Sequence, residues 1–310
     1  MIRTRLSLSG GLKKASGALF SFFNINSETV LNPNIALSFV GGKFNCNVLK
    51  TSDYNGIDIS VFDIFGYANP YIADIVAEGG SDPFGGIVGA DTFLTTHYCL
   101  NERVFNVRGA GFFDCLLYFS GNGSHDVYDG AGQSGLVRGG GAARCGNGIA
   151  VKRNYVGLTV ENFMIANCQN GIIGSNTDNI PNNHGTGTRV LGGQISNIRG
   201  RPIVIYGKNP VVENVTIGEF GYDVPDGQTP TGTRSGNEIA GIDLRGAIGG
   251  RVANNVIRTR TLTNDPRLGI SLRQDADGVA SRGCKIYGNS ISGPARAIYT
   301  QPNSSYDPNP

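Results

Sequence analysis

The 310-residue sequence lacks a long hydrophobic run. No apolar stretch approaches the ~18 residues that a helix needs to cross a bilayer. Charge is also scarce, since charged residues make up only 16% of the chain and the formal net charge is +2. The overall charge therefore gives no argument for a nucleic-acid partner. From these two shortages we expect neither a membrane nor a nucleic acid as partner.

Clustered metal ligands are also missing. The cysteines form no CxxC pair and no Cys/His group, which argues against a structural zinc site. Most of them lie in strand-like contexts, so we expect buried thiols rather than a disulfide framework. The six cysteines are Cys46, Cys99, Cys115, Cys145, Cys168 and Cys284. The sequence predicts no metal and no cofactor.

Glycine is the residue in excess, with 47 copies. This content disfavours long helices, because glycine costs ~1 kcal/mol relative to alanine at each helical position. The strict Gly-X-Y period of collagen is absent. Hydrophobic residues reach 39% of the chain, which is enough for a sizeable core. These features favour an all-β fold with many turns.

A short pattern recurs along the chain, in which an apolar residue and a spacer precede Asn, Asp or Gly. Val212-Glu213-Asn214 and Val252-Ala253-Asn254 are two copies. The third position, which we call the slot, is occupied at Gly42, Asp63, Asn106, Asp129, Asn162, Gly192, Asn214, Asn254 and Gly288. A second apolar strand follows most slots, at 116–119, 148–151, 171–173, 203–205, 241–244, 269–272 and 297–299.

The spacing of these elements defines a repeat. A slot precedes the second strand by about 10–11 residues, and the next slot follows after about 11–13, so the basic coil has about 22 residues. Such a period, with β-branched strands and Gly/Asn turns, is typical of a solenoid. We predict a parallel β-helix of about nine or ten coils, ~45 Å tall at ~4.8 Å per coil. A β-propeller or sandwich built of hairpins is the alternative.

The positions of the slots provide the main test of the β-helix prediction. Asn and Gly tolerate the left-handed backbone of a sharp bend, and stacked Asn side chains can bond one coil to the next. If the chain winds in stacked coils, Asn162, Gly192, Asn214 and Asn254 must lie in one column.

Loops added to the coil carry the function in repeat proteins. Segments 131–147, 218–238 and 258–267 follow a slot, whereas 174–189 and 273–283 follow a second strand. We therefore expect insertions on one or two sides of the rod. Segments 218–238 and 258–267 belong to consecutive coils, so they should be neighbours and wall a cleft.

The walls of this cleft contain carboxylates and arginines, which suit an acidic sugar polymer. Two carboxyl groups can act as acid and base in glycoside hydrolysis, and arginine binds acidic groups bidentately. The candidate catalytic residues are Glu219, Asp223 and Asp226. The candidate substrate-binding residues are Tyr222, Arg234, Glu238, Arg258, Arg260 and Arg267. Alternatively, these are solvated loop charges that pair among themselves.

The segment 174–189 offers Asp178 and His184 in a Gly/Asn-rich context. Histidine can act as a general base, and an exposed loop histidine without a role is the alternative.

Two stretches carry a family resemblance, "SHDVYDGAGQSG" at 124–135 and "YVGLTVENFMIANCQNGI" at 155–172. They resemble the pectin-lyase-like superfamily, and the polygalacturonase branch especially. The resemblance implies a right-handed parallel β-helix, and the segments "NTD" at 176–178 and "NHG" at 183–185 imply catalytic roles for Asp178 and His184. The consecutive aspartates and the Arg-x-Lys element of that branch do not occur in this chain.

The chain also resembles the β-helices of phage tailspikes, since it is rich in Gly and Asn, carries little charge and has irregular loops on one flank. This resemblance implies a homotrimer that binds or cuts bacterial surface polysaccharide, with other virion tail proteins as further partners. It implies a location on the virion tail or outside the cell.

The expected organisation is a capping or attachment segment at 1–30, the β-helix at 31–300 and an extended tail at 301–310. We expect a polysaccharide-recognising β-helix of the tailspike type that binds and depolymerises bacterial surface glycan as a hydrolase or lyase. One alternative is a non-catalytic virion structural or adhesin-like protein. Another is a secreted pectinase-type glycosidase or lyase.

Overall fold

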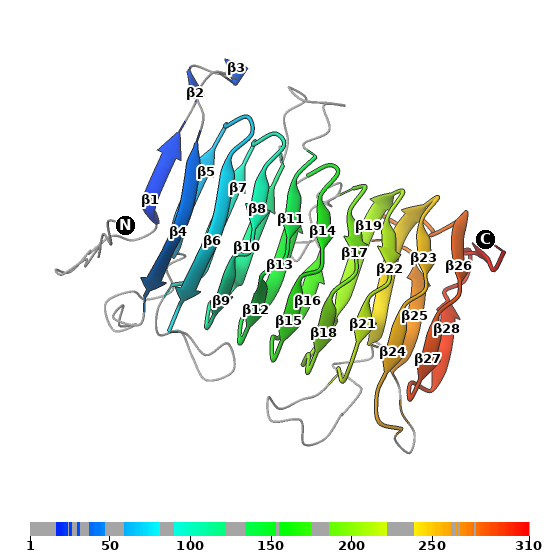
Figure 1. Ribbon diagram of the computed structural model, residues 1–310. Helices are drawn as coiled ribbons and strands as arrows, with labels where there is room; N and C mark the ends of the chain where they lie inside the picture. Colours follow the sequence, from blue (N-terminus) through cyan, green and yellow to red (C-terminus); the bar gives the residue numbers. More distant parts are fainter. Residues whose placement is uncertain are drawn as a thin grey trace.

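The computed structural model describes residues 17–23, 25–26, 30–31, 37–46, 59–80, 90–121, 134–152, 155–174, 186–221, 239–261, 265, 267–275 and 277–309. All regular structure within these residues is β-strand. Figure 1 shows the strands side by side in a row, from β1 near one terminus to β28 near the other. A search of the described residues finds no helix that could cross a membrane.

One sheet of ten strands runs the length of the rod, and we call it the long sheet. Every neighbouring pair in it is parallel. Its strands, in spatial order, are β1 (Gly17–Phe23), β5 (Ile59–Phe65), β7 (Thr92–His97), β10 (Cys115–Ser120), β13 (Asn147–Lys152), β16 (Asn170–Ile173), β19 (Ile203–Lys208), β22 (Ala240–Ile248), β25 (Leu268–Arg273) and β28 (Arg296–Thr300).

The other large sheet consists of two rows of short parallel strands. The first short row contains β8 (Arg103–Phe105), β11 (Leu136–Arg138), β14 (Thr159–Glu161), β17 (Arg189–Leu191), β20 (Val211–Glu213), β23 (Arg251–Ala253), β26 (Cys284–Tyr287) and β29 (Tyr306–Asp307). The second contains β9 (Arg108–Ala110), β12 (Gly141–Ala143), β15 (Met164–Ala166), β18 (Gln194–Ser196), β21 (Thr216–Ile217), β24 (Val256–Arg258) and β27 (Ser290–Ser292). The longer strands β4 (Ser38–Asn45) and β6 (Tyr71–Glu78) serve both rows.

A regular coil therefore contributes one strand to the long sheet and one to each short row. The chain is a right-handed parallel β-helix, as the pattern and the pectin-lyase-like resemblance predicted. All seven predicted second strands lie in the long sheet, which confirms that part of the repeat. A short antiparallel pair, β2 (Ile25–Asn26) and β3 (Val30–Leu31), stands apart from both large sheets.

The slots form the bend between the two short rows. The strand registers place Asn162, Gly192, Asn214 and Asn254 in one column, which confirms the central prediction. Each has a positive φ, from 52° at Asn162 to 70° at Gly192, in the left-handed region that Asn and Gly tolerate. The backbone N–H of each slot donates to a carbonyl of the following coil, as at Asn162, 3.0 Å from the oxygen of Leu191.

Two of the other predicted slots are wrong. The registers put Gly41 and Asp74 in the column, so Gly42 is one residue late and Asp63 lies in β5 of the long sheet. The triplet that ends at Asp63 lies within the continuous strand β5, where a polar residue also follows apolar ones. The predicted slot Asp129 lies outside the described residues.

Gly139, with φ of 64°, occupies the slot between Asn106 and Asn162. Consequently 131–147 is not an insertion after a slot, because 136–143 forms two regular short strands. In the sequence, the extra residues of this coil fall between β10 and β11, as 174–189 fall between β16 and β17.

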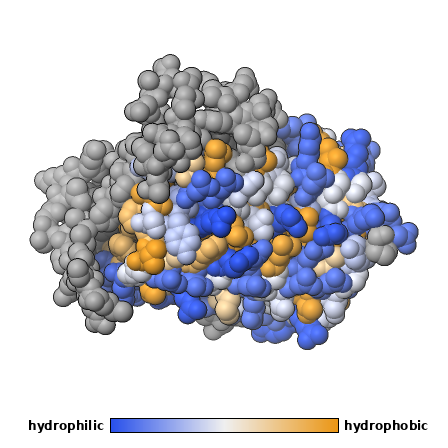
Figure 2. Space-filling view, turned by 45° about the horizontal axis from the view of Figure 1, so that its top comes forward, coloured by the Kyte–Doolittle hydropathy of each residue, from blue (hydrophilic) through white to orange (hydrophobic). Residues whose placement is uncertain are grey.

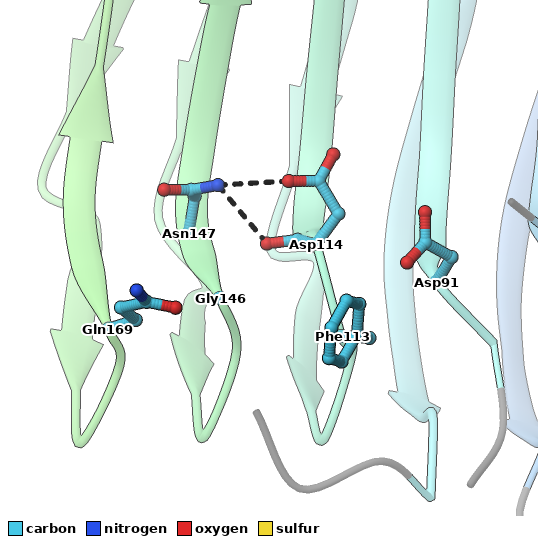
Figure 3. A pocket seen from close by; sticks show the side chains of 6 residues that line it. All are labelled: Asp91, Phe113, Asp114, Gly146, Asn147 and Gln169. Carbon is cyan, nitrogen blue, oxygen red and sulfur yellow. Dashed lines mark hydrogen bonds between the residues drawn. The ribbon is translucent and has the colours of Figure 1, made fainter. Parts of the chain in front are cut away.

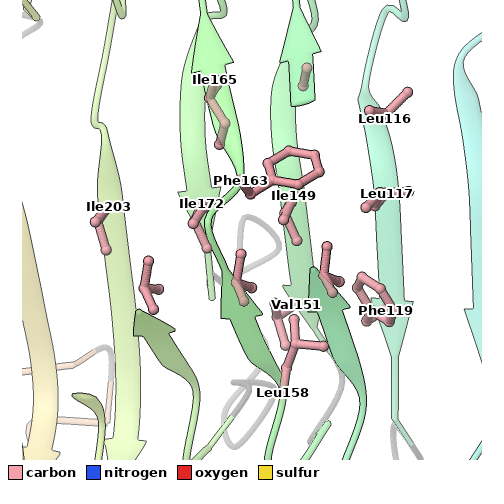
Figure 4. Close-up of a cluster of buried hydrophobic side chains, with 14 of the residues drawn as sticks. Leu116, Leu117, Phe119, Ile149, Val151, Leu158, Phe163, Ile165, Ile172 and Ile203 are labelled. Carbon is pink, nitrogen blue, oxygen red and sulfur yellow. The ribbon is translucent and has the colours of Figure 1, made fainter. Parts of the chain in front are cut away.

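The interior is filled by identical or similar side chains stacked coil upon coil. Figure 4 shows Leu117, Ile149, Ile172 and Ile203 at the same level on neighbouring strands of the long sheet. A column in the first short row is built of β-branched residues, all of them buried. Its members are Ile72, Val104, Val137, Val160, Val190, Val212, Val252 and Ile286. All six cysteines are free and buried, as predicted.

Side-chain amides join the coils, and the best-connected of them is at the position after the slot. Asn255 is fully buried, and its Nδ2 donates to Val212 O and to Asn289 Oδ1, both at 2.9 Å. Its Oδ1 accepts from the backbone N of Val215 at 2.9 Å. The prediction placed bonds between coils on the slots themselves, and one such bond is confirmed: Asn106 Nδ2 donates to Asp74 Oδ1 at 3.1 Å. The slot side chains Asn254 and Asn214 are exposed instead.

The first and last described strands belong to the two large sheets. Strand β1, within the predicted segment 1–30, pairs with β5, and β29, within the predicted tail 301–310, pairs with β26. Exposed large hydrophobic side chains, such as Val40 and Met164, are few among the described residues. On the coloured part of the surface in Figure 2, hydrophobic residues lie in small groups among hydrophilic ones.

Candidate functional site

Four of the predicted site residues lie in the described structure, namely Glu219, Arg258, Arg260 and Arg267. Arg258 and Arg260 are exposed, whereas Arg267 is fully buried. The other predicted site residues are outside the described residues: Asp178, His184, Tyr222, Asp223, Asp226, Arg234 and Glu238. Their roles remain predictions.

The two predicted cleft walls meet at the corner between the second short row and the long sheet. Glu219 Oε1 accepts a hydrogen bond of 2.9 Å from the backbone N of Arg260, and the Nε of that arginine lies 3.6 Å away. Glu219 Oε2 lies 3.6 Å from Nη1 of Arg267. The prediction that these consecutive loops are neighbours is therefore confirmed for their described parts.

The buried side chain of Arg267 forms hydrogen bonds with several segments at this corner. Its Nε donates to both carboxylate oxygens of Asp265, at 2.9 and 3.0 Å, and its Nη2 donates to Oδ2 at 2.7 Å. Nη1 donates to Phe220 O at 3.2 Å, and Nη2 also donates to Arg260 O. With the side chain 0% exposed, these contacts give Arg267 a role in holding the wall.

A second group of candidate functional side chains was not predicted from the sequence. On the long sheet, Asp243 alternates with the core residues Ile242 and Leu244, so it points away from the core. Ser271 and Tyr299 are its register partners on the next two coils. We call the outward side of this sheet the long-sheet face.

Asp243 is the centre of an ion-pair network on this face. Its Oδ2 accepts from Arg245 at 2.8–2.9 Å, and its Oδ1 lies 3.4 Å from Arg273 Nε. Ser271 Oγ donates to the same Oδ1 at 2.5 Å. Asp243 is fully buried, while the side chains of Arg245 and Arg273 are 21% and 13% exposed.

Aromatic rings accompany these arginines. The guanidinium of Arg245 lies 5.9 Å from the ring of Tyr206 and donates to its hydroxyl at 3.3 Å. The guanidinium groups of Arg273 and Arg296 each lie 5.7 Å from the ring of Tyr299. Next to them, Ile173, Val204 and Tyr206 form a buried apolar cluster separate from the main core.

The same face carries aromatic and charged groups toward its N-terminal end. His97 Nε2 lies 3.4 Å from Asp63 Oδ1, and the imidazole stacks on Phe65 with ring centroids 4.6 Å apart. Burial raises the pKa of Asp63. Farther along, the ammonium of Lys152 lies 5.2 Å from the ring centroid of Tyr118.

A pocket of about 300 Å³ lies where the strands of the long sheet begin. Figure 3 shows Asp91 and Asp114 on neighbouring coils, with Asn147 next to them. Asn147 Nδ2 donates to Asp114 Oδ1 at 3.0 Å, and Asn170 Nδ2 donates to Asn147 Oδ1 at 3.0 Å. Asn170 Oδ1 accepts in turn from the backbone N of Arg201 at 3.1 Å, so a chain of amides links the pocket to Arg201.

No group of three or more His, Cys, Asp or Glu residues within the described ranges is arranged to hold a metal ion.

The signal for the long-sheet face was present in the sequence. "GIDLR" at 241–245 and "GISLR" at 269–273 share polar residues at every second position, Asp243/Arg245 and Ser271/Arg273. A strand with one buried side alternates in this way. Aligning the second strands by their apolar residues would have placed these polar residues in the same outward columns.

No family model matches the chain, and no curated protein matches it. Among solved structures it is similar to tailspike protein 3 of bacteriophage CBA120, with a TM-score of 0.30 and 8% identity over 87% of this chain. The match covers 50% of that protein, so the chain spans about half its length. It is also similar to the A-module of the mannuronan C-5 epimerase AlgE4 of Azotobacter vinelandii, with a TM-score of 0.25 and 12% identity over 88% of this chain and 80% of that one.

Proposed function

We propose that this chain is a polysaccharide-recognising β-helix of the tailspike type, and that the long-sheet face takes part in binding. The observation that carries the proposal is the recurrence of tyrosine–cation pairs along one face, each formed between adjacent coils. Lys152 lies over the half-buried Tyr118 and Arg273 over the half-buried Tyr299, while Arg245 lies over Tyr206, which is itself buried.

This recurrence suits an extended polymer of repeating units. Neighbouring coils lie ~4.8 Å apart, so tyrosine and cationic side chains recur at intervals along the rod. A tyrosine ring packs against the apolar side of a sugar and keeps its hydroxyl for a polar partner. Arginine donates several hydrogen bonds in a fixed planar arrangement. A small compact ligand would use only one of these coils.

Binding can be tested with the full chain and a panel of bacterial capsular polysaccharides and lipopolysaccharides, using isothermal titration calorimetry. We expect at least one polymer to bind. Tyr118→Ala should weaken that binding by about tenfold, equivalent to ~1.4 kcal/mol. The matched control is Tyr71→Ala, which removes an equally half-buried tyrosine from β6. The proposal fails if no polymer binds, or if both variants bind as tightly as the unmodified chain.

In this proposal the protein acts as a homotrimer on a virion tail, or outside the cell, with other tail proteins as partners. The resemblance to tailspikes supports this assembly. Light scattering on the full chain should then give three times the chain mass of 32.7 kDa. A monomer at micromolar concentration would contradict the trimer and leave the binding face to be judged by calorimetry.

A second candidate function, cleavage of the bound polymer, is favoured by the Asp91–Asp114 pair. These residues are register neighbours, because Thr92 and Cys115 pair across the same two coils. Neighbouring strands lie ~4.8 Å apart, and retaining glycosidases hold their two carboxyl groups ~5 Å apart. The pair lines a pocket, and Asn147 orients Asp114. One carboxyl group would attack the sugar, and the other would protonate the leaving oxygen.

A reducing-end assay on the polymer that binds tests this second function. We expect new reducing ends, which Asp91→Asn and Asp114→Asn each abolish. Asp74→Asn serves as the control, because Asn is common at slots and Asp74 belongs to the slot column. Binding without new reducing ends would exclude glycoside hydrolysis and favour the non-catalytic adhesin or virion role.

A further inference from the structure

We infer that Arg201, Arg245 and Arg273 form a subsite for the acid group of a sugar residue, so that the polymer recognised is anionic. This inference rests on the proposed function and adds a substrate class to it. The shared chemistry is an oxyanion on a sugar, and a uronic acid carboxylate or a sulfate ester could supply it.

The first argument is geometric. Arg245 and Arg273 are register partners on adjacent coils, and both reach the buried carboxylate of Asp243. The carboxylate of Asp243 therefore positions both guanidinium groups. Ser271 also donates to this carboxylate and helps to fix its orientation. Both side chains remain partly exposed, so their outer edges can reach a ligand on the long-sheet face.

The second argument is electrostatic and concerns Arg201. Burial lowers the pKa of its guanidinium, and the positive charges of Arg245 and Arg273 lower it further, against the opposing effect of Asp243. Its Nε is buried and has no hydrogen-bond partner among the described residues. An anion bound between Arg201 and its neighbours would relieve this repulsion and give Nε a hydrogen-bond acceptor.

The contrast with Arg245 supports this assignment. Burial opposes the charge of Arg245 as well, but Asp243 and the hydroxyl of Tyr206 outweigh that effect and raise its pKa. The protein therefore provides Arg245 with a carboxylate and places Arg201 where a further negative group would be favourable. Arg201 is also at the end of the amide chain that begins in the Asp91–Asp114 pocket, which aligns the two along the rod.

The surroundings favour a sugar over a free ion. Tyr299 is half-buried and presents an aromatic ring beside Arg273, 5.7 Å from its guanidinium. Binding sites for sugar acids need this combination, since cations meet the acid group while an apolar side excludes water from the ring. A simple inorganic anion would make no use of the apolar neighbour.

The test uses calorimetry with the full chain and four probes of equal length. Tetragalacturonate carries carboxylates, its fully methyl-esterified form is neutral, a carrageenan tetrasaccharide carries sulfates, and cellotetraose is neutral. We expect one acidic probe to bind at least about tenfold more tightly than both neutral ones, with a preference that weakens as salt rises. The acidic probe that binds more tightly identifies the acid group.

Arg201→Gln is the decisive variant, because it removes the charge while keeping a polar side chain of similar length. We expect it to lower affinity for the acidic probe by about tenfold and to leave the neutral probes unchanged. Arg201→Lys should fall between, since lysine keeps the charge without the planar donors. Arg189→Gln, on an exposed position of β17, is the matched control and should bind like the unmodified chain.

The inference is overturned if no acidic probe binds more tightly than the neutral ones, or if Arg201→Gln and Arg189→Gln behave alike. The proposed function survives that result if the chain binds a neutral polymer from the wider panel. If no polysaccharide of any kind binds, the proposed function fails and the inference fails with it.

Discussion

Arginines pair with carboxylates in two different settings on this rod, one exposed and one buried, and the two settings differ in what the pairs contribute to stability. On the first short row, Arg138 pairs with Glu161 at 2.7 Å, while the arginine side chain is 57% exposed. At the corner between the second short row and the long sheet, Arg267 also pairs with a carboxylate, that of Asp265. Both of these side chains are almost completely buried.

The difference lies in what surrounds each pair. Water solvates the exposed groups whether or not they pair, so such pairs contribute little to stability. A buried guanidinium has lost that solvation, and only its protein partners replace it. Arg267 has Asp265, Phe220 O and Arg260 O as partners, which join two coils. The buried charges therefore contribute to the stability of the fold, whereas the exposed pairs contribute little.

The largest expected effect comes from breaking the buried pair. Arg267→Ala should lower the free energy of unfolding by ~3–5 kcal/mol, because it leaves the carboxylate of Asp265 buried without a cation. Urea denaturation followed by circular dichroism measures this. Adding Asp265→Ala should recover part of the loss, since the uncompensated charge is then removed. A loss below about 1 kcal/mol for Arg267→Ala would show that this pair behaves like an exposed one.

Glu102 extends the comparison to a buried carboxyl group that forms no ion pair with any described residue. It accepts hydrogen bonds from Tyr155 at 2.5 Å and from Thr96 at 3.3 Å. Burial raises its pKa from 4.5 to about 8, against the lowering effect of these bonds. The folded protein therefore keeps the proton at neutral pH, while the unfolded chain releases it near pH 4.5.

Stability should accordingly fall as pH rises from about 4.5 to 8, by up to ~1.4 kcal/mol per pH unit from this group. Glu102→Gln, which cannot ionise, should remove this slope and be the more stable form above pH 8. Urea denaturation at a series of pH values checks both points. An identical pH profile for the two proteins would mean that Glu102 is not the group responsible.

A smaller effect separates a buried neutral side chain from an exposed one. Asn255→Ala should lower the free energy of unfolding by ~1–3 kcal/mol, because Val212 O and the backbone N of Val215 lose their partner. Asn254→Gly, at the exposed slot next to it, should change stability by less than ~1 kcal/mol, since glycine adopts its φ of 56° readily. Equal losses of stability from the two variants would contradict the assignment of these bonds between coils to the buried residue after the slot.

The smallest effect is expected on the first short row. Glu161→Gln removes the partner of exposed Arg138 and should change the free energy of unfolding by ~0–1 kcal/mol, less still at high salt. Thermal denaturation at low and high salt measures it. A loss comparable to that of Arg267→Ala would remove the distinction between the two settings.

Much of the fold could be predicted from short patterns. The slots at Asn162, Gly192, Asn214 and Asn254 were found because a left-handed bend accepts few residue types, so the same residues recur at each coil. The prediction failed at Asp63, where a matching triplet is part of an ordinary strand, and at Gly139, whose matching triplet Val137-Arg138-Gly139 was not recognised as a slot. A tripeptide does not reveal whether it bends or continues, because the hydrogen bonds to the adjacent coils decide that.

The candidate site was predictable only in part. The meeting of Glu219 and Arg260 followed from the order of the coils, and the structure confirms it. The network of Asp243, Arg245 and Arg273 was missed, because its strands were interpreted by their apolar residues alone. The remaining predicted site residues, including Asp223 and Asp226, lie outside the described residues and stay predictions.

The sequence by itself determined the period, the bend residues and the apolar columns, because each depends on residue types that only one local conformation accommodates. The tertiary structure alone decided which polar groups share a site. Arg245 and Arg273 lie 28 residues apart in the chain and become neighbours only through the register of β22 and β25. That register depends on the length of every loop between them and on hydrogen bonds between coils. The burial that turns an ordinary charge into a structural or binding group exists only once the coils have stacked.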